Sequence, residues 1–139
     1  MRVLANEALR AGPVVIAGAD DPYTRRADIA ALVRSAARHD APVVTLSHSP
    51  DIVPQLPPRF GLVLAGHTHC GQIALPLIGR VATMSDHGDR YACGVIREGG
   101  RTVIVGAGLG TSLLPLRYGA PPDFWVITIG PLAPAHGLR

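Results

Sequence analysis

Short apolar runs that end in histidines are the feature that most constrains the fold of this 139-residue chain. The run 62–65 is followed by Gly-His-Thr-His at 66–69, and the run 43–46 by Ser-His at 47–48. Four-residue apolar runs bounded by turn residues are typical of buried strands. Functional groups gather at the carboxyl ends of strands in parallel sheets. The pattern therefore predicts a metal site built from His48, His67 and His69.

The order of elements around these runs predicts an α/β domain with a parallel βαβ start. We expect a strand over 14–17, followed by a helix that begins at Thr24 or Asp28. Two further strands are expected over 43–46 and 61–65. Strands that alternate with helical segments in this way imply a parallel sheet with right-handed crossovers.

The second part of the chain predicts antiparallel pairing. Segments 91–97 and 101–105 flank a Glu-Gly-Gly turn, which favours a hairpin, and 124–129 reads as a final strand. We assign residues 1–130 to a single domain and residues 131–139 to a tail.

The charge pattern excludes one class of partner, and hydropathy gives no sign of a membrane-spanning helix. The net charge is +3, and the 13 basic residues are all arginines spread along the chain. A nucleic-acid reader would cluster its positive charge, so no nucleic-acid partner is expected. No apolar stretch approaches the roughly 20 residues of a spanning helix and no leader is visible, so the chain reads as soluble.

Three further features carry weaker predictions. Cys70 and Cys93 form no CxxC pair, so Cys70 is expected to be either a small buried thiol or a thiolate ligand. His87, in a polar loop near the site, is expected to contact substrate. The G-x-G-x-G stretch at 106–110 lacks the spacing of a dinucleotide loop, which favours a backbone loop packed close to the metal site.

The blocks SHSPD at 47–51 and GHTHCGQI at 66–73 resemble the last two motifs of the calcineurin-like metallophosphoesterases. More narrowly, the second block is similar to the bacterial branch that reads GHTH-x-GQI, and blocks at 18–22, 108–112 and 121–122 extend the resemblance over nearly the whole chain. The resemblance implies the C-terminal part of a four-layer α/β sandwich with a dimetal centre of Mn, Fe or Zn. His48 and His67 would bind one ion and His69 the other.

The remaining ligands of the family come from D-x-H, G-D and G-N-H motifs. This sequence contains no D-x-H and no G-N-H, and its Gly-Asp pair at 88–89 follows a polar loop instead of a strand. The chain therefore resembles the C-terminal half of such an enzyme, with the proton-donor histidine outside it. We expect the chain alone to be inactive, and its missing N-terminal half to lie in another chain. A sheet without its first strands would expose an edge and an apolar face, which favours dimerisation or aggregation.

The implied reaction is metal-dependent hydrolysis of a phosphomonoester, a phosphodiester or a pyrophosphate link. Lipid-linked or nucleotide-sugar substrates are expected, because intact relatives of this branch often carry a membrane anchor. The residues leave two alternatives open. One is a non-catalytic zinc-binding module that uses His48, His67, His69 and Cys70. The other is an interaction domain without a metal.

Overall fold

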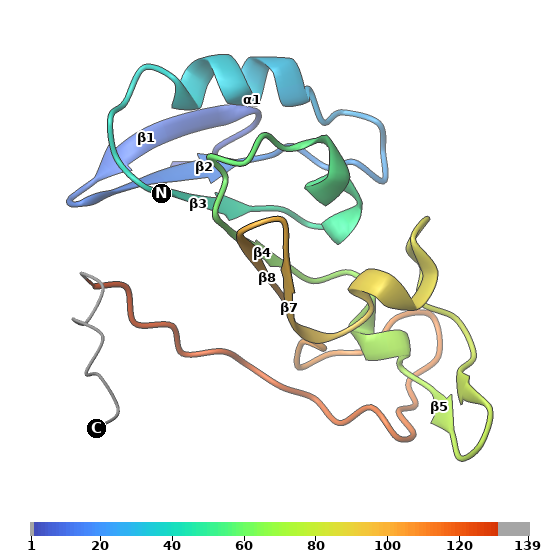
Figure 1. The fold of residues 1–139 in the computed structure, drawn as a ribbon. Helices are drawn as coiled ribbons and strands as arrows, with labels where there is room; N and C mark the ends of the chain where they lie inside the picture. The colour runs from blue at the N-terminus through green and yellow to red at the C-terminus, as the bar shows by residue number, and fades with distance from the viewer. Residues whose placement is uncertain (1, 131–139) are drawn as a thin grey trace, which may run out of the picture.

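A mixed six-stranded sheet is the centre of the fold in the computed structural model, which describes residues 2–130 (Figure 1). Its strand order is β1-β2-β3-β4-β8-β7. The strands are β1 (Glu7–Ala11), β2 (Val14–Gly18), β3 (Val43–Leu46), β4 (Leu62–Ala65), β7 (Gly94–Glu98) and β8 (Arg101–Val105). A separate two-stranded hairpin consists of β5 (Ala74–Leu75) and β6 (Gly79–Arg80). The helical segments are α1 (Ile29–Ala36) and the 3-10 turns η1 (Pro50–Gln55), η2 (His69–Gly71) and η3 (Gly88–Tyr91).

The four central strands β2, β3, β4 and β8 are parallel, and the two outer strands pair antiparallel. This arrangement confirms the predicted α/β class, with its parallel βαβ start and its antiparallel hairpin. The hairpin strand β7 begins at Gly94 rather than at the predicted residue 91, because Tyr91 lies in η3 and is fully buried.

Helix α1 begins where a capping side chain satisfies its first free N–H groups. The Asp28 carboxylate accepts a hydrogen bond from the Ala31 N–H at 2.8 Å. Of the two predicted starts, Asp28 is therefore the cap, while Thr24 bonds the Asp21 carboxylate instead. None of the helices in residues 2–130 has the length and apolar character needed to cross a bilayer.

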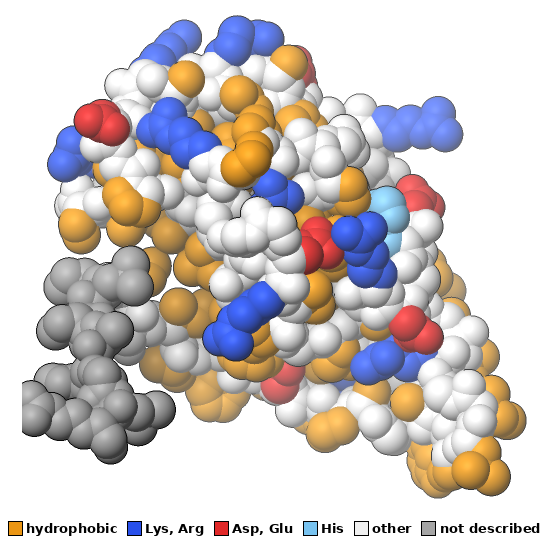
Figure 2. Space-filling view, viewed as in Figure 1, with side chains coloured by type: hydrophobic (Ala, Val, Ile, Leu, Met, Phe, Trp, Pro, Cys, Tyr) orange, Lys and Arg blue, Asp and Glu red, His pale blue; other side chains and the backbone are white. Residues whose placement is uncertain are grey.

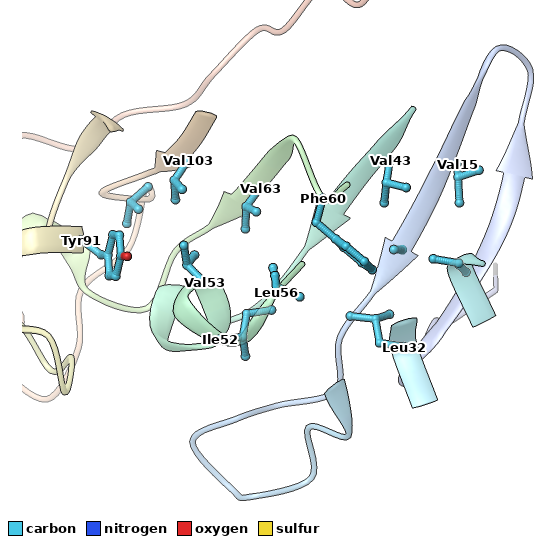
Figure 3. Packing of buried hydrophobic residues seen from close by; sticks show 14 residues of the cluster. Val15, Leu32, Val43, Ile52, Val53, Leu56, Phe60, Val63, Tyr91 and Val103 are labelled. Carbon is cyan, nitrogen blue, oxygen red and sulfur yellow. The ribbon is translucent and has the colours of Figure 1, made fainter. Parts of the chain in front are cut away.

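The core lies on the face of the sheet that α1 and η1 cover (Figure 3). Successive side chains of a strand point to opposite faces of the sheet, so every second strand residue points into this core. Each of the four central strands contributes a fully or almost fully buried valine, and the helical segments and the loop before β4 add larger side chains. The strand valines are Val15, Val43, Val63 and Val103, and the larger buried side chains include Tyr91, Phe60, Leu32 and Ile52.

The opposite face of the sheet is apolar and open in the described residues. Ile16, Leu46 and Leu64 line a cavity of about 590 Å³ on this face, together with Leu4. Leu46 is 42% exposed, although it lies in a central strand. Apolar surface of this kind normally meets another layer of structure. The open face is the one that the sequence predicts; dimerisation through it stays a prediction.

The predicted final strand over 124–129 is wrong. This segment has no strand pairing, and Phe124 and Val126 are 78% and 84% exposed (Figure 1). Its alternating apolar residues favour a strand, but a strand forms only against a partner, and no described strand pairs with it. The predicted tail, 131–139, lies outside the described residues.

A buried arginine joins β8 to the segment that precedes β4. Arg101 is 9% exposed, and its guanidinium donates to the carbonyls of Val53 (2.5 Å), Leu56 (2.6 Å), Pro57 (2.9 Å) and Phe60 (3.1 Å). These carbonyls lie at the end of η1 and just after it. Those of Val53 and Pro57 also accept from the N–H groups of Leu56 and Phe60, so the guanidinium adds a charged donor to a turn that the backbone pairs only in part.

Replacing Arg101 with methionine should lower the free energy of unfolding by about 3 kcal/mol, because four carbonyls lose a charged donor in a buried place. Urea denaturation measures the change. Arg97→Met on neighbouring β7 is the matched control, since Arg97 is exposed and should give a change of under about 0.5 kcal/mol. Equal effects of the two substitutions would contradict this role of Arg101.

Candidate metal centre

The parallel pairing of β3 with β4 brings His48 and His67 together. The ladder continues past both strands, because the Ser47 N–H donates to the Leu64 carbonyl and the Gly66 N–H to the His48 carbonyl, each at 3.0 Å. The two imidazole rings then meet edge to face, with 4.6 Å between their centroids. Two of the three predicted ligands therefore lie side by side at the carboxyl edge of the sheet.

The His67 ring presents a nitrogen that the described residues leave without a partner. Its Nε2 atom is buried and has no hydrogen bond. The Tyr23 ring packs against it at 5.0 Å between centroids. Burial lowers the pKa of His67 below its usual range, and the nearby His48 lowers it further. The neutral form that results is the form of imidazole that binds metal ions.

Two carboxylates from this chain also act on His67, a contribution that sequence analysis missed. The charges of Asp51 and Asp21 both raise its pKa, against the larger effect of burial. The Asp51 Oδ1 accepts a hydrogen bond from the Ser85 hydroxyl at 2.5 Å. Their positions were a usable signal, since Asp51 follows His48 by three residues and Asp21 follows the end of β2 by three. The acidic groups near the site are therefore not all outside the chain.

His69 has different neighbours from the other two histidines. Its Nδ1 atom lies 3.1 Å from the Ala107 carbonyl oxygen and 3.3 Å from Nη2 of Arg117. If Nδ1 carries the proton and donates to Ala107, Nε2 is left for a metal ion, as in many metal-binding histidines. Within residues 2–130, no three His, Cys, Asp or Glu side chains are grouped so that they could hold one ion.

The loop that carries His67 and His69 has an unusual backbone. Four of its residues other than glycine have positive φ: His67 (70°), His69 (49°), Cys70 (55°) and Gln72 (53°). Each such residue costs on the order of 1–3 kcal/mol, and such residues cluster at functional sites. Gly66 is not among the positive-φ residues, so the sharp turn falls on His67 itself.

Buried contacts hold this strained loop in place. Thr68, between the two histidines, is 2% exposed, and its hydroxyl donates to the Ala92 carbonyl at 2.8 Å. Gly71 has φ of +80°, and a Cβ there would approach the Arg80 side chain to 2.9 Å. The loop is thus held by the hydrogen bond of the Thr68 hydroxyl and by close packing at Gly71.

Cys70 and Cys93 form a disulfide, which corrects both predictions for Cys70. A disulfide sulfur is not a thiolate, so Cys70 supplies no fourth ligand for a zinc ion. The two cysteines are 23 residues apart in sequence, and only the fold brings η2 next to the start of β7. The bond ties the residue after His69 to the sheet.

The glycine-rich loop at 106–110 packs against His69, as predicted. The Gly108 position lies 4.0 Å from Nδ1 of His69, measured from the Cβ that a side chain there would have. The Asp123 Oδ1 accepts from the N–H groups of Ala107 (2.7 Å) and Gly108 (3.1 Å). Arg117 donates to the carbonyls of the same loop and to the His69 carbonyl. Nothing in the sequence pattern indicates these roles of Asp123 and Arg117.

A cavity of about 680 Å³ opens beside Tyr23 and Asp51. Its lining includes Arg25 and the loop residues 83–86. His87, predicted to contact substrate, is outside this lining; its N–H bonds the Ser85 hydroxyl at 3.2 Å and its ring packs on Tyr91 at 5.4 Å. A substrate contact of His87 stays a prediction.

Curated proteins of four bacteria match this chain over a shared region. An Aquifex aeolicus protein named uncharacterized metallophosphoesterase is 32% identical over 92% of this chain and 50% of its own length. The chain is related to the metallophosphoesterases. The Bacillus subtilis metallophosphoesterase YkuE is 38% identical over 62% of this chain and 30% of its own length. The Escherichia coli phosphodiesterase YaeI is 32% identical over 68% of this chain and 34% of its own length.

This relationship confirms the predicted resemblance at the level of the metallophosphoesterases, while the narrower branch stays a prediction. The mixed α/β sheet is consistent with a metallophosphoesterase-type fold. The chain spans about 30 to 50% of the length of these relatives, and the match is to a C-terminal metallophosphoesterase region. No family model matches the chain. No solved structure matches it significantly.

The disulfide gives a direct test of the loop. Protein purified without reductant should show no thiol that reacts with Ellman's reagent after denaturation, and two thiols after reduction. The double variant Cys70→Ser/Cys93→Ser should lose about 3 kcal/mol of unfolding free energy, because the bond closes a loop of 23 residues. Two reactive thiols in the unreduced denatured protein would contradict the bond.

Proposed function

We propose that this chain supplies the histidine side of the metal centre of a metal-dependent phosphoester hydrolase. The observation that carries the proposal is the buried Nε2 of His67, which lacks a hydrogen-bond partner among the described residues and lies beside the ring of His48. A buried polar nitrogen without a partner is costly unless something else binds it. A divalent ion fits both the lone pair and the neutral state of the ring.

The donor set suits Mn, Fe or Zn, which imidazole and carboxylate ligands bind well. His48 and His67 would hold one ion, and His69, whose Nδ1 faces a carbonyl, would hold a second through Nε2. Bound ions of this kind supply Lewis acidity toward phosphoryl oxygens. Neutral imidazoles do not balance two divalent charges, so carboxylates must join them. Asp51 and Asp21 are two carboxylates of this chain whose charges raise the pKa of His67.

The cavity beside Tyr23 provides the substrate side of this proposal. It adjoins the ring that packs on His67 and includes the Arg25 side chain, whose guanidinium can pair with a phosphate. The substrate class is a phosphomonoester, a phosphodiester or a pyrophosphate, with lipid-linked and nucleotide-sugar compounds as the expected kinds. The name of the matched phosphodiesterase YaeI supports a phosphoester.

We also propose that this chain by itself does not catalyse hydrolysis. The relatives are two to three times longer than the part that matches. The Gly-Asp pair of this sequence, at 88–89, does not directly follow a strand, and the D-x-H and G-N-H motifs are absent. The histidine that protonates the leaving group belongs to the last of these motifs. Another polypeptide segment must therefore complete the centre before turnover.

Metal binding is tested by thermal unfolding with Mn²⁺ or Zn²⁺. At an ion concentration 100-fold above Kd, the chain should gain about 2.7 kcal/mol of stability and melt at a higher temperature. His67→Ala should abolish this gain, because it removes the unpartnered nitrogen. His39→Ala, on the loop after α1, should leave the gain unchanged. An equal loss in both variants, or no gain in the unsubstituted chain, would overturn the proposed centre.

Catalytic inactivity is tested with bis-p-nitrophenyl phosphate and p-nitrophenyl phosphate in the presence of Mn²⁺. We expect no release of nitrophenolate above the rate with His67→Ala, because the ligands of the D-x-H motif and the proton-donor histidine are absent from this chain. Robust turnover that His67→Ala abolishes would show that the chain completes the centre by itself, and would contradict the fragment interpretation.

A further inference from the structure

An apolar rim beside His69 protrudes from the molecule, and we propose that it docks on the surface of a lipid bilayer that contains anionic lipids. The rim consists of segment 73–82, which includes the β5–β6 hairpin, and of loop 109–118. The metal-site inference does not assign this surface. A link between this surface and phosphoester hydrolysis rests on the proposed function, but docking on the bilayer requires no metal ion.

The side chains at the rim are large, apolar and exposed. Leu77 at the hairpin tip is 108% exposed, and Leu113 in the second loop is 93% exposed. Ile78, Val81, Leu114 and Leu116 are each more than half exposed. Figure 2 shows apolar side chains gathered over the hairpin, at the lower right of the molecule. Single exposed apolar residues are ordinary, but a continuous group of this kind marks an interaction site.

The two segments are held side by side by backbone and side-chain bonds. Tyr118 pairs with Ile73 in a parallel bridge, and its carbonyl accepts from the Ala74 N–H at 2.7 Å. The Gln72 side chain spans both segments, since its amide donates to the Leu114 carbonyl (2.8 Å) and accepts from the Ser112 N–H (2.6 Å). The rim is therefore a fixed surface, and its apolar exposure is built into the fold.

The charge of the rim suits an anionic lipid surface. Residues 69–85 and 107–122 contain two arginines, Arg80 and Arg117, and no acidic residue. Arg80 pairs with Asp89 at 3.2 Å, outside these ranges. Arg117 makes no ion pair with the part of the chain that the structure describes, since its bonds go to carbonyl oxygens and to His69. Exposed leucines with an arginine behind them suit an interface that combines apolar lipid chains with anionic headgroups.

The shape of the rim favours a bilayer over a second protein layer. The open sheet face around Leu46 and Leu64 is the surface that a further layer of structure would cover. The hairpin tip instead protrudes from the molecule. Its apolar side chains can therefore enter the lipid headgroup region while the rest of the fold keeps its own contacts. A cavity of about 240 Å³ between the two segments is also lined by His69, so docking would bring the candidate metal centre to the membrane surface.

The test is sedimentation of the 139-residue chain with vesicles of phosphatidylglycerol and phosphatidylcholine, compared with phosphatidylcholine alone. We expect binding to the mixed vesicles to be about fivefold tighter at low salt, from the charge of Arg117, and the difference to shrink in 0.5 M NaCl. Leu77→Asp/Leu113→Asp should weaken binding at least tenfold. Val3→Asp/Val126→Asp is the matched control, with the same charge change at exposed apolar positions outside the rim.

Retained binding by the control, loss by the rim variant and equal melting temperatures of the two would support the proposal. No binding to either vesicle, or equal losses in both variants, would overturn it. A rim variant that changes a dimer into a monomer without changing vesicle binding would assign the surface to a second protein copy, and would also overturn it. Vesicle binding without added metal ions separates this proposal from the proposed phosphoesterase, whose failure would leave the docking result intact.

Discussion

The parallel register of β3 with β4 is the constraint on which the candidate site depends. Leu46 pairs with Leu64, and hydrogen bonds from Ser47 and Gly66 extend the ladder beyond both strands. This extension fixes where His48 and His67 leave the sheet, so their rings meet without any direct bond between them. A shift of one residue in this register would send the strand side chains to opposite faces and would separate the rings.

The loop after β4 needs several restraints to keep His67 and His69 in place. Its positive-φ residues are unfavourable in isolation, and they persist because the surroundings restrain them. Thr68 bonds a buried carbonyl, Cys70 is joined to Cys93, and Arg117 donates to the carbonyl of His69. These three restraints come from different parts of the chain. The position of His69 is therefore a property of the whole second half of the fold.

Local patterns predict the strands, the capped helix and the meeting of His48 with His67, because each follows from periodicity or from strand direction. The disulfide and the role of Arg101 could not be predicted in this way. Both join residues that are distant in sequence. Two cysteines 23 residues apart do not by themselves indicate that a bond forms, and nothing in the sequence indicates the carbonyls that Arg101 bonds. The error over 124–129 has the same cause. Alternating apolar residues report the tendency to form a strand, and not the presence of another strand to pair with.

One physical cause accounts for both the open sheet face and the unpaired segment 124–129. The apolar face around Ile16 and Leu46 has no covering layer in the described residues, and Phe124 and Val126 are exposed next to no strand. Both features are stable only if further structure buries them. The length of the relatives indicates that such structure exists in proteins of this kind, since the chain spans 30 to 50% of them. A segment that covered this face would lie against the same sheet whose carboxyl edge carries His48 and His67.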